Sequence, residues 1–342
     1  MSAVPPRNDS QSMKKIINFN NALLLAPLAG FTDAAQRQIS SLQGADWCYT
    51  EMVSAKGLMY GNEKTADLLL TPPAQKITAV QLFGSQPEVF SEVLKNFAEL
   101  APFDIVDINM GCPVQKVVKS GEGSALSKDI KLAGEIIAAC KKAASKKIVT
   151  AKIRSGWDAD NITAVEMAKA LEDNGADAVT VHARTREQFY TGECDYRLVS
   201  RVKNVVKIPV IVSGGIVDKE SYDRIRAETG CSAVMIGRGA LGSDIFRRLV
   251  IARSKATKQS HGENGDTIDY VPVTNVQWNP AEAFLYHLRL MIEYYGERYA
   301  VTNIRKFGPY YFRRIPNTKE LRNNINTAKT TKDMEGILNQ SQ

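Results

Sequence analysis

Eight short β-rich runs recur between residues 23 and 236, and this repetition constrains the fold more than any other feature of the chain. Most of the runs are continuously apolar, as expected of parallel strands that are buried on both faces. The expected strands are Leu23–Ala26, Trp47–Met52, Thr78–Leu82, Ile105–Asn109, Ile148–Ile153, Ala178–Val181, Val210–Val212 and Ala233–Ile236. Amphipathic stretches lie between them, and the clearest are Pro87–Leu100, Ile130–Ala144, Ile162–Asn174, Tyr196–Val202 and Lys219–Thr229. Alternating units of this kind over roughly 240 residues predict an α/β fold, a (β/α)8 TIM barrel.

The chain beyond the eighth run predicts a second, smaller unit. Residues 255–275 are polar and lack a period, which indicates a linker or long loop. Segments with helical spacing follow and predict a small C-terminal helical bundle; they are Ala281–Tyr295, Ala300–Phe312, Thr318–Asn326 and Thr330–Leu338. The expected organisation is a flexible leader at 1–20, a catalytic barrel at 21–255, a linker at 256–279 and the bundle at 280–342.

Composition narrows the class of protein. No apolar stretch approaches the ~20 residues that span a bilayer, and the N-terminus lacks the apolar core of a signal peptide, so we expect a cytoplasmic protein without a membrane partner. The five cysteines are scattered and never form a CxxC pair, and only three histidines are present. This pattern argues against a disulfide scaffold or a metal cluster and favours an organic cofactor. No protein partner is implied.

In a barrel of this type the active site lies at the C-terminal ends of the strands, so the residues that follow each strand are the candidates for it. Ser213-Gly214-Gly215 follows the seventh expected strand, and Gly237-Arg238-Gly239 follows the eighth. Glycines let backbone N–H groups approach an anion, and Arg238 adds positive charge. A single Gly-Gly pair is also found in ordinary turns, but two such turns at strands seven and eight predict a phosphate site.

Gln81, Lys152 and His182 lie at the ends of strands three, five and six. A flavin ring needs such a set, because an amide can bond its edge and a cation can stabilise the negative charge of its reduced form. Each residue also has an ordinary interpretation, since a lysine at a strand end is often solvated and a histidine on an apolar strand is often a core group. Their convergence beside a phosphate site favours the flavin.

Cys112 lies three residues after the fourth expected strand, in the run Val106-Asp107-Ile108-Asn109-Met110-Gly111-Cys112-Pro113. Gly111 and Pro113 stop the strand and fix the turn, so backbone geometry aims the thiol at the barrel mouth. A lone cysteine is more often a small buried apolar residue. At this position it is a candidate catalytic group.

The C-terminal segment combines cations with aromatic residues. Its cations are Arg289, Arg298, Arg305, Lys306, Arg313, Arg314, Lys319, Arg322, Lys329 and Lys332, and tyrosines lie between them. The net charge of +7 and the pI near 9.0 also favour a polyanionic partner. A solvated basic face around a tyrosine-rich core is the alternative for any single residue. The cluster as a whole suggests an RNA-binding surface.

Several motifs together resemble the tRNA dihydrouridine synthases, most closely their bacterial B-type branch. The matching segments are Ala26-Pro27-Leu28-Ala29-Gly30-Phe31-Thr32-Asp33, Glu51-Met52-Val53-Ser54-Ala55, Val80-Gln81-Leu82-Phe83-Gly84, Asp107-Ile108-Asn109-Met110-Gly111-Cys112-Pro113, Gly121-Glu122-Gly123-Ser124-Ala125-Leu126, Ala151-Lys152-Ile153-Arg154-Ser155-Gly156-Trp157, Val181-His182-Ala183-Arg184-Thr185-Arg186-Glu187-Gln188 and Ile236-Gly237-Arg238-Gly239-Ala240. They follow one another in the order that the family shows. Ser213 differs from the asparagine that relatives often carry there.

The resemblance implies an enzyme that reduces the C5–C6 double bond of uridines in tRNA, with FMN as cofactor and NADPH as reductant. Hydride would pass from flavin N5 to C6, and the Cys112 thiol would protonate C5. The implied FMN contacts are Pro27, Leu28, Ala29, Gln81, Lys152, His182, Ser213, Gly214, Gly215, Gly237 and Arg238. The implied or candidate substrate contacts are Asn109, Arg154, Arg184, Arg305 and Lys306. No metal site is implied.

Two other functions remain open from the sequence. An FMN barrel of the dihydroorotate dehydrogenase type would use a similar flavin site on a free pyrimidine, without needing a basic C-terminal segment. A non-catalytic RNA-binding protein could retain the barrel, although the presence of Cys112, Lys152 and His182 argues against it.

Overall fold

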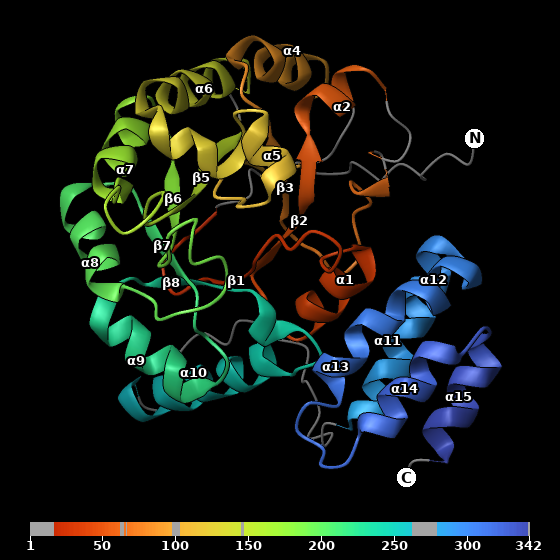
Figure 1. The fold of residues 1–342 in the computed structure, drawn as a ribbon. Helices are drawn as coiled ribbons and strands as arrows, with labels where there is room; N and C mark the ends of the chain where they lie inside the picture. Colours follow the sequence, from red (N-terminus) through yellow and green to blue (C-terminus); the bar gives the residue numbers. More distant parts are fainter. Residues whose placement is uncertain are drawn as a thin grey trace.

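The computed structural model describes residues 17–61, 65, 67–97, 103–144, 147–261 and 279–340, and its centre is a closed parallel barrel (Figure 1). The strands pair in chain order, and β1 pairs with β8 to close the barrel. Their bounds are β1 Leu23–Leu25, β2 Trp47–Ser54, β3 Thr78–Phe83, β4 Ile105–Met110, β5 Ile148–Arg154, β6 Ala178–His182, β7 Val210–Ser213 and β8 Ala233–Ile236. The predicted (β/α)8 barrel is therefore confirmed, and all eight predicted strands are present.

Alternation along each strand separates two apolar cores. Outward-facing residues such as Val106 and Ile108 join the core between the strands and the surrounding helices. Residues of the other parity, such as Ile105 and Ala178, join a separate cluster with Trp47 that fills one end of the barrel interior. Successive side chains of a strand point to opposite faces. Asp107 and Asn109 share the parity of Ile105, so β4 changes from an apolar to a polar interior toward its C-terminal end.

The helices of the barrel form a ring around the strands (Figure 1). Their bounds are α1 Ala34–Leu42, α2 Ala55–Met59, α4 Pro87–Phe97, α5 Gln115–Lys119, α6 Ile130–Ala143, α7 Ala164–Asp173, α8 Tyr196–Val205, α9 Lys219–Thr229 and α10 Ile245–His261, with the 3-10 turns η1 Gly123–Lys128 and η2 Arg238–Ala240. Side-chain caps begin several of them, and Asp218 forms a reciprocal capping box with Ser221 at the start of α9.

The C-terminal segment is a helical bundle, as predicted, but it contains one more break than its periodicity suggests. Its elements are α11 Pro280–Tyr295, α12 Glu297–Ile304, η3 Arg305–Phe307, α13 Gly308–Tyr311, α14 Lys319–Thr327 and α15 Thr331–Asn339. The single helix predicted over 300–312 is wrong, because η3 separates α12 from α13. Pro309 has no N–H to donate to the preceding turn, and it lies in the first turn of α13, where that loss is tolerated.

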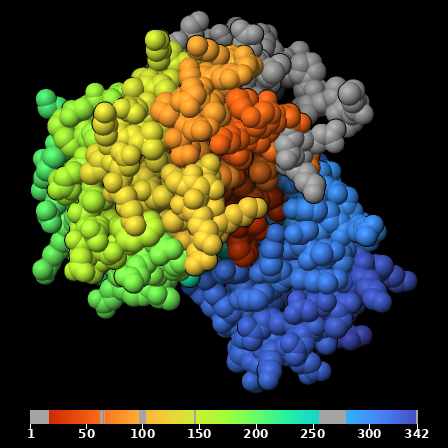
Figure 2. Space-filling model, turned by 45° about the horizontal axis from the view of Figure 1, so that its top comes forward, coloured from red at the N-terminus to blue at the C-terminus, as the bar shows by residue number. Residues whose placement is uncertain are grey.

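The bundle shares an apolar core with the first part of the barrel. Ala35 and Ile39 of α1 belong to the same buried cluster as the bundle residues. The rings of Phe31 and Phe307 meet edge to face with centroids 5.4 Å apart, and Ala34 donates its backbone N–H to the Tyr295 hydroxyl at 2.9 Å. Figure 2 shows the blue bundle lying against the red N-terminal segment of the barrel. This joint sets the bundle beside the β1–α1 loop.

Two predicted segments lie wholly or partly outside the described residues. Of the predicted leader at 1–20, the structure describes only residues 17–20. Helix α10 extends to His261 and so includes the first residues of the predicted linker at 256–279, whereas residues 262–278 are outside the described ranges. None of the helices in the described part has the length and apolar character needed to cross a membrane.

Candidate active site

The predicted site residues of β3, β4 and β5 meet inside the barrel. Gln81 pairs in register with Asp107, and Asn109 pairs with Lys152. The Asn109 Nδ2 donates to Gln81 Oε1 at 2.8 Å, which joins two strands through their side-chain amides. Gln81 is 1% and Asn109 is 8% exposed, so this polar contact is sheltered from water. The interior therefore becomes polar at the rim where a barrel active site is expected.

The Cys112 loop is held at several backbone atoms. Asn109 Oδ1 accepts the backbone N–H of Cys112 at 2.9 Å and that of Gly111 at 3.2 Å. Ser124 donates its backbone N–H to the Cys112 carbonyl oxygen at 3.0 Å. Gly123 lies directly against this turn, because a Cβ there would come within 2.9 Å of the Cys112 carbonyl oxygen. The position of the Cys112 side chain is thus set by a loop with little freedom.

Cys112 is a half-buried free thiol. Burial raises the pKa of this thiol, while the backbone N–H of Val114 and the cations Arg154 and Lys152 oppose the shift. Burial disfavours a thiolate, so the group holds its proton at neutral pH. Among the four other cysteines, Cys48, Cys140 and Cys231 are buried, and only Cys194 is similarly half-buried. The chemistry available to Cys112 is that of a positioned proton donor.

Lys152 and His182 add a cation and a neutral ring to the same rim. Burial lowers the pKa of Lys152 to about 8, with Arg154 acting in the same direction and Asp107 in the opposite one. Within the described part of the chain its Nζ has no hydrogen-bond or ion-pair partner. Burial and the nearby cations hold the pKa of His182 well below its ordinary value, so this imidazole is neutral at pH 7.

Arg154 and Arg184 mainly hold backbone carbonyl groups. Arg154 donates its Nε to the Gly111 carbonyl oxygen at 2.7 Å, and its Nη1 donates to the carbonyl oxygens of Thr185 and Phe189. Arg184 donates its Nη2 to the Gly192 carbonyl oxygen at 2.9 Å. Its Nη1 lies 3.5 Å from His182 Nε2. Both arginines therefore order the β6–α8 loop, and their predicted substrate contacts remain a prediction.

The two glycine turns after β7 and β8 lie together. Gly214 and Gly215 have φ angles of 110° and 78°, which favour glycine. A Cβ on Gly239 would lie 2.2 Å from the Ile216 carbonyl oxygen, so the second turn rests directly on the first. Among the described residues, the backbone N–H groups of Gly214 and Gly215 have no acceptor. Such free N–H groups at adjacent turns fit the predicted phosphate.

The remaining predicted cofactor residues surround these turns. Ser213 ends β7 and is buried. A Cβ on Gly237 would meet only side-chain atoms of Ala26 and Leu28, so this glycine faces the β1–α1 loop. Leu28 uses its own N–H locally, because it donates to Thr32 Oγ1 at 2.9 Å. Pro27 and Leu28 are half-buried, whereas Ala29 is exposed.

Arg238 is exposed and bends toward the β6–α8 loop. Its Nη2 donates to the Tyr190 carbonyl oxygen at 3.1 Å, and its guanidinium lies 4.9 Å from the centre of the Tyr190 ring. The same ring lies 5.5 Å from the guanidinium of Arg154. Tyr190 thus sits between two predicted site arginines. Sequence reasoning missed this tyrosine, because its loop carries no periodic signal.

Arg305 and Lys306 are both half-buried. Arg305 donates its Nη2 to the Ala328 carbonyl oxygen inside the bundle. Lys306 Nζ lies 5.7 Å from the centre of the Phe31 ring, at the joint with the barrel. Its charge also acts on the pKa of Asp33 and of Glu51, two carboxyl groups of the barrel. The structure therefore brings Lys306, but not Arg305, toward the barrel.

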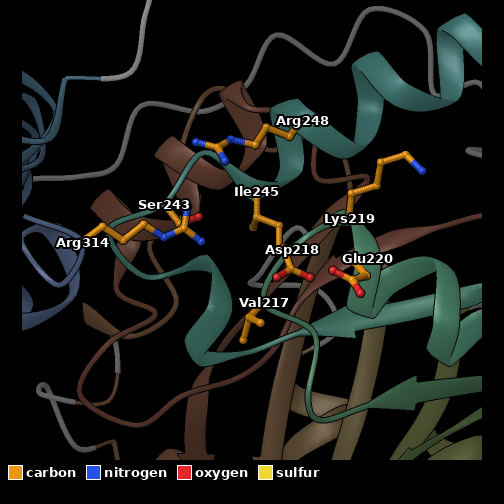
Figure 3. A pocket seen from close by; sticks show the side chains of 8 residues that line it. All are labelled: Val217, Asp218, Lys219, Glu220, Ser243, Ile245, Arg248 and Arg314. Carbon is orange, nitrogen blue, oxygen red and sulfur yellow. The ribbon is translucent and has the colours of Figure 1, made fainter.

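A surface pocket of about 280 Å³ lies outside these turns, between the β7–α9 loop and the start of α10 (Figure 3). Its lining residues are Val217, Asp218, Lys219, Glu220, Ser243, Ile245, Arg248 and Arg314. None of the predicted site residues lines it. Arg314 reaches it from the bundle, and carboxylates face the same space (Figure 3). Its lining combines cations with carboxylates and includes none of the residues predicted to hold a cofactor, so this pocket is distinct from the predicted site.

Comparisons with known proteins cover almost the whole chain. A family model described as dihydrouridine synthase matches residues 24–342. The tRNA-dihydrouridine synthase B of Pseudomonas aeruginosa is 35% identical over 312 residues, covering 91% of this chain and 90% of the relative. That of Vibrio parahaemolyticus is 34% identical over 315 residues, covering 91% and 93%.

Solved structures agree on the barrel. A histamine dehydrogenase from Rhizobium sp. 4-9 superposes with a TM-score of 0.52 at 13% identity, covering 69% of this chain and 47% of that one. This likeness concerns the fold alone. The family match extends from β1 to the end of the helical bundle and includes the Cys112 loop. From that match and the identity of the two bacterial relatives, we conclude that the chain belongs to the dihydrouridine synthase family.

Proposed function

We propose that this protein reduces the C5–C6 double bond of uridines in tRNA, using bound FMN and NADPH as the reductant. The observation that carries the proposal is the Cys112 thiol, which Asn109 and Arg154 hold through the loop backbone beside Lys152. The names of the bacterial relatives support tRNA as the substrate. The five free cysteines fit a reducing compartment, and we propose the cytoplasm.

The residues of the rim fit a flavin mononucleotide. Within the described ranges, Lys152 offers an ammonium without a protein partner, and the Gly214–Gly215 turn offers free N–H groups for a terminal phosphate. We propose that Pro27, Leu28, Ala29, Gln81, Lys152, His182, Ser213, Gly214, Gly215, Gly237 and Arg238 hold FMN. When bound and reduced, FMN supplies the hydride equivalent that uracil C6 receives.

The protein's own chemical task is the second half of the reduction. Saturating a C5–C6 double bond with hydride at C6 leaves C5 as the carbon that needs a proton. Cys112 Sγ holds a proton at neutral pH, because burial raises the pKa of the thiol. We propose that this thiol protonates C5 and then regains a proton from solvent. Asn109 keeps its carbonyl oxygen on the Cys112 loop while its amide nitrogen bonds Gln81.

The substrate uridine belongs to a folded RNA, so the base must leave its stack to reach the barrel rim. The rest of the RNA then needs a separate cationic surface. Exposed cations of the bundle are available for this, among them Arg298, Arg314, Lys319, Lys329 and Lys332. We propose that the bundle holds tRNA while the base enters the barrel, and that Arg154 and Arg184 order the loop around it.

The test is mass spectrometry of nucleosides from an unmodified tRNA transcript incubated with the protein, FMN and NADPH. We expect a gain of two hydrogens on uridine. The Cys112→Ala variant should lose most turnover but keep bound flavin, and Cys231→Ala, which changes a buried cysteine remote from the site residues, should act like the wild type. A wild-type protein that oxidises NADPH with a free pyrimidine but leaves tRNA unchanged would overturn the proposal.

A further inference from the structure

A fully buried carboxyl group lies beneath the active-site residues and has no part in the chemistry proposed above. Asp107 is 0% exposed and sits in the middle of β4. It pairs in register with Gln81 on β3 and with Thr150 on β5, so the three residues lie side by side across neighbouring strands. Its Oδ2 accepts from Gln81 Nε2 at 2.7 Å, and its Oδ1 accepts from Thr150 Oγ1 at 2.6 Å.

These two contacts are the first of a series of hydrogen bonds in which each donor and each acceptor is fixed. A carboxylate can only accept, so Asp107 takes the NH₂ end of Gln81 and turns the Gln81 oxygen toward Asn109. Asn109 must then present its own NH₂ end to Gln81. Its oxygen is left facing the loop, where it accepts the N–H of Cys112 at 2.9 Å. Two side-chain amides therefore transmit the polarity of one carboxylate to the loop.

We propose that Asp107 is the positioning residue of this site, and that its carboxylate orients the Gln81 and Asn109 amides and thereby orders the Cys112 loop. The hydrogen bonds of the Asp107 carboxylate go to Gln81 and Thr150 and not to the loop itself. Thr150 supports it from the opposite side by occupying the second oxygen. The proposal uses the proposed function only for its kinetic test, because the ordering of the loop can be measured without substrate.

Asp107 is a carboxylate only above a certain pH. Burial raises the pKa of Asp107 to about 6, while Thr150, Gln81 and the charge of Lys152 oppose the shift. Of the titratable groups around it, Lys152 on β5 lowers the pKa of Asp107, whereas Asp107 itself raises the pKa of Tyr49 on β2. Above about pH 6 Asp107 accepts from both neighbours. Below that pH one oxygen carries a proton, and the direction of the Gln81 amide is no longer imposed.

The variants are chosen as matched pairs. Asp107→Asn keeps the shape but adds an NH₂ group that can face Gln81, so the amide direction becomes ambiguous. Thr150→Val removes the hydroxyl that bonds Asp107. Thr180→Val makes the same change on β6, where the buried hydroxyl has no partner among the described residues, and it serves as the control. Asn109→Ala removes the side-chain oxygen that accepts the loop N–H groups, so it should show the largest loss of order in the loop.

Hydrogen exchange measured by mass spectrometry on a peptide spanning residues 109–117 reads the loop directly. We expect Asp107→Asn to speed exchange at the Gly111 and Cys112 amides by about fivefold, the effect of one lost hydrogen bond, and Thr180→Val to leave it unchanged. Asn109→Ala should show at least the same increase. If Asp107→Asn and Thr180→Val exchange alike, the proposal is wrong. If Asp107→Asn does not fold, Thr150→Val against Thr180→Val decides the question in the same way.

Kinetics on tRNA give a second readout. Asp107→Asn should lower kcat by about tenfold with little change in KM, because the proposed RNA contacts lie on the bundle. The acid limb of the wild-type kcat profile near pH 6 should be absent in this variant. An equal loss in Thr180→Val would contradict a positioning role. If the wild type shows no turnover on tRNA, the proposed function fails, whereas the exchange comparison still tests Asp107.

Discussion

The guanidinium of Arg154 donates its Nε to the carbonyl oxygen of Gly111 at 2.7 Å, and so it fastens the turn that carries Cys112. The same side chain donates its Nη1 to the carbonyl oxygens of Thr185 at 2.8 Å and Phe189 at 2.7 Å. One residue of β5 therefore joins the β4 turn to the β6–α8 loop. This connection between the two loops depends on the planar guanidinium of arginine, because its N–H donors point in fixed, different directions.

We therefore expect Arg154→Lys to impair turnover more than stability. A lysine keeps the positive charge, but its single ammonium cannot reach all three carbonyl oxygens. The kcat on tRNA should fall at least tenfold, while the thermal midpoint falls by only a few degrees. Steady-state kinetics and a calorimetric melt check this. Full activity in Arg154→Lys would show that charge, and not the joined loops, is what the site needs.

The thiol of Cys112 should ionise only above the pH range in which a free cysteine does, because burial raises its pKa. The rate of alkylation by iodoacetamide, followed on the peptide that contains Cys112, reports the thiolate fraction as pH rises. Lys152 has itself lost its charge above about pH 8, so Lys152→Met should leave the alkylation midpoint nearly unchanged. A midpoint below that of glutathione would contradict a protonated thiol at neutral pH.

The alternation of apolar strands and helices was sufficient to predict the barrel, because a parallel strand buried on both faces leaves a clear apolar run. The sequence also placed Gln81, Lys152 and His182 at strand ends; His182 ends β6, whereas β3 and β5 continue two residues beyond Gln81 and Lys152. The sequence could not show which hydrogen-bond partners each side chain has. Asp107 looks like an isolated polar residue in an apolar strand until the register places it between Gln81 and Thr150.

In the bundle, too, the sequence does not show which cations are bonded inside the fold. A cation in a basic segment can be a surface group or can bond a carbonyl inside the fold, and spacing alone does not distinguish these states. Arg305 has an internal partner in the Ala328 carbonyl oxygen, whereas Arg314 is exposed beside the pocket. The break at η3 was not predicted, because helical periodicity continues through residues 305–307.

Lys152 gives a prediction for cofactor binding. Its pKa of about 8, lowered by burial, means that the ammonium is lost as pH rises through that value. FMN affinity of the wild type should therefore weaken by about tenfold between pH 7 and pH 9.5, the size expected for one charge-assisted hydrogen bond. Fluorescence quenching of added FMN measures this. Lys152→Met should bind FMN weakly at every pH, and an unchanged slope in this variant would assign the effect to another group.

Asp33 offers a test of stability against pH. It is 6% exposed, and its Oδ1 caps α1 by accepting the Gln36 N–H, while its Oδ2 has no partner among the described residues. Burial, helped by Glu51, raises its pKa from 3.8 to about 6. The folded protein therefore binds this proton more tightly than the unfolded chain. The resulting stability is complete below about pH 4 and is lost as pH rises through 6.

Asp33→Asn should remove that pH-dependent cost while keeping a good helix cap. At pH 7.5 the variant should be more stable than the wild type by about 1–3 kcal/mol, and the difference should shrink as pH falls toward 5. Urea unfolding at both pH values measures the free energy of unfolding. A variant that is less stable at pH 7.5 would show that the ionised carboxylate contributes a favourable interaction, such as that with the charge of Lys306 in the bundle.

The bundle contains two kinds of cation, exposed and half-buried, whose contributions to RNA binding can be compared. Arg314 and Lys319 are exposed, whereas Arg305 and Lys306 are half-buried at internal contacts. Phosphate contacts release counterions, so removing a cation that binds RNA lowers both the affinity and its dependence on salt. Arg314→Gln with Lys319→Gln should reduce the slope of log Kd against log salt by roughly 1 for each lost contact.

Arg305→Gln should act mainly on stability, because it leaves the Ala328 carbonyl oxygen inside the bundle without its donor. Lys306→Gln removes a charge from the joint between bundle and barrel, beside the Phe31 ring. Titrations of tRNA at several salt concentrations, combined with thermal melts of each variant, distinguish the two groups. If Arg305→Gln and Lys306→Gln flatten the salt slope while the melts stay unchanged, RNA binds over this joint, and the sequence-based choice of these residues is correct. If only the exposed pair moves the slope, the RNA follows the outer face of the bundle.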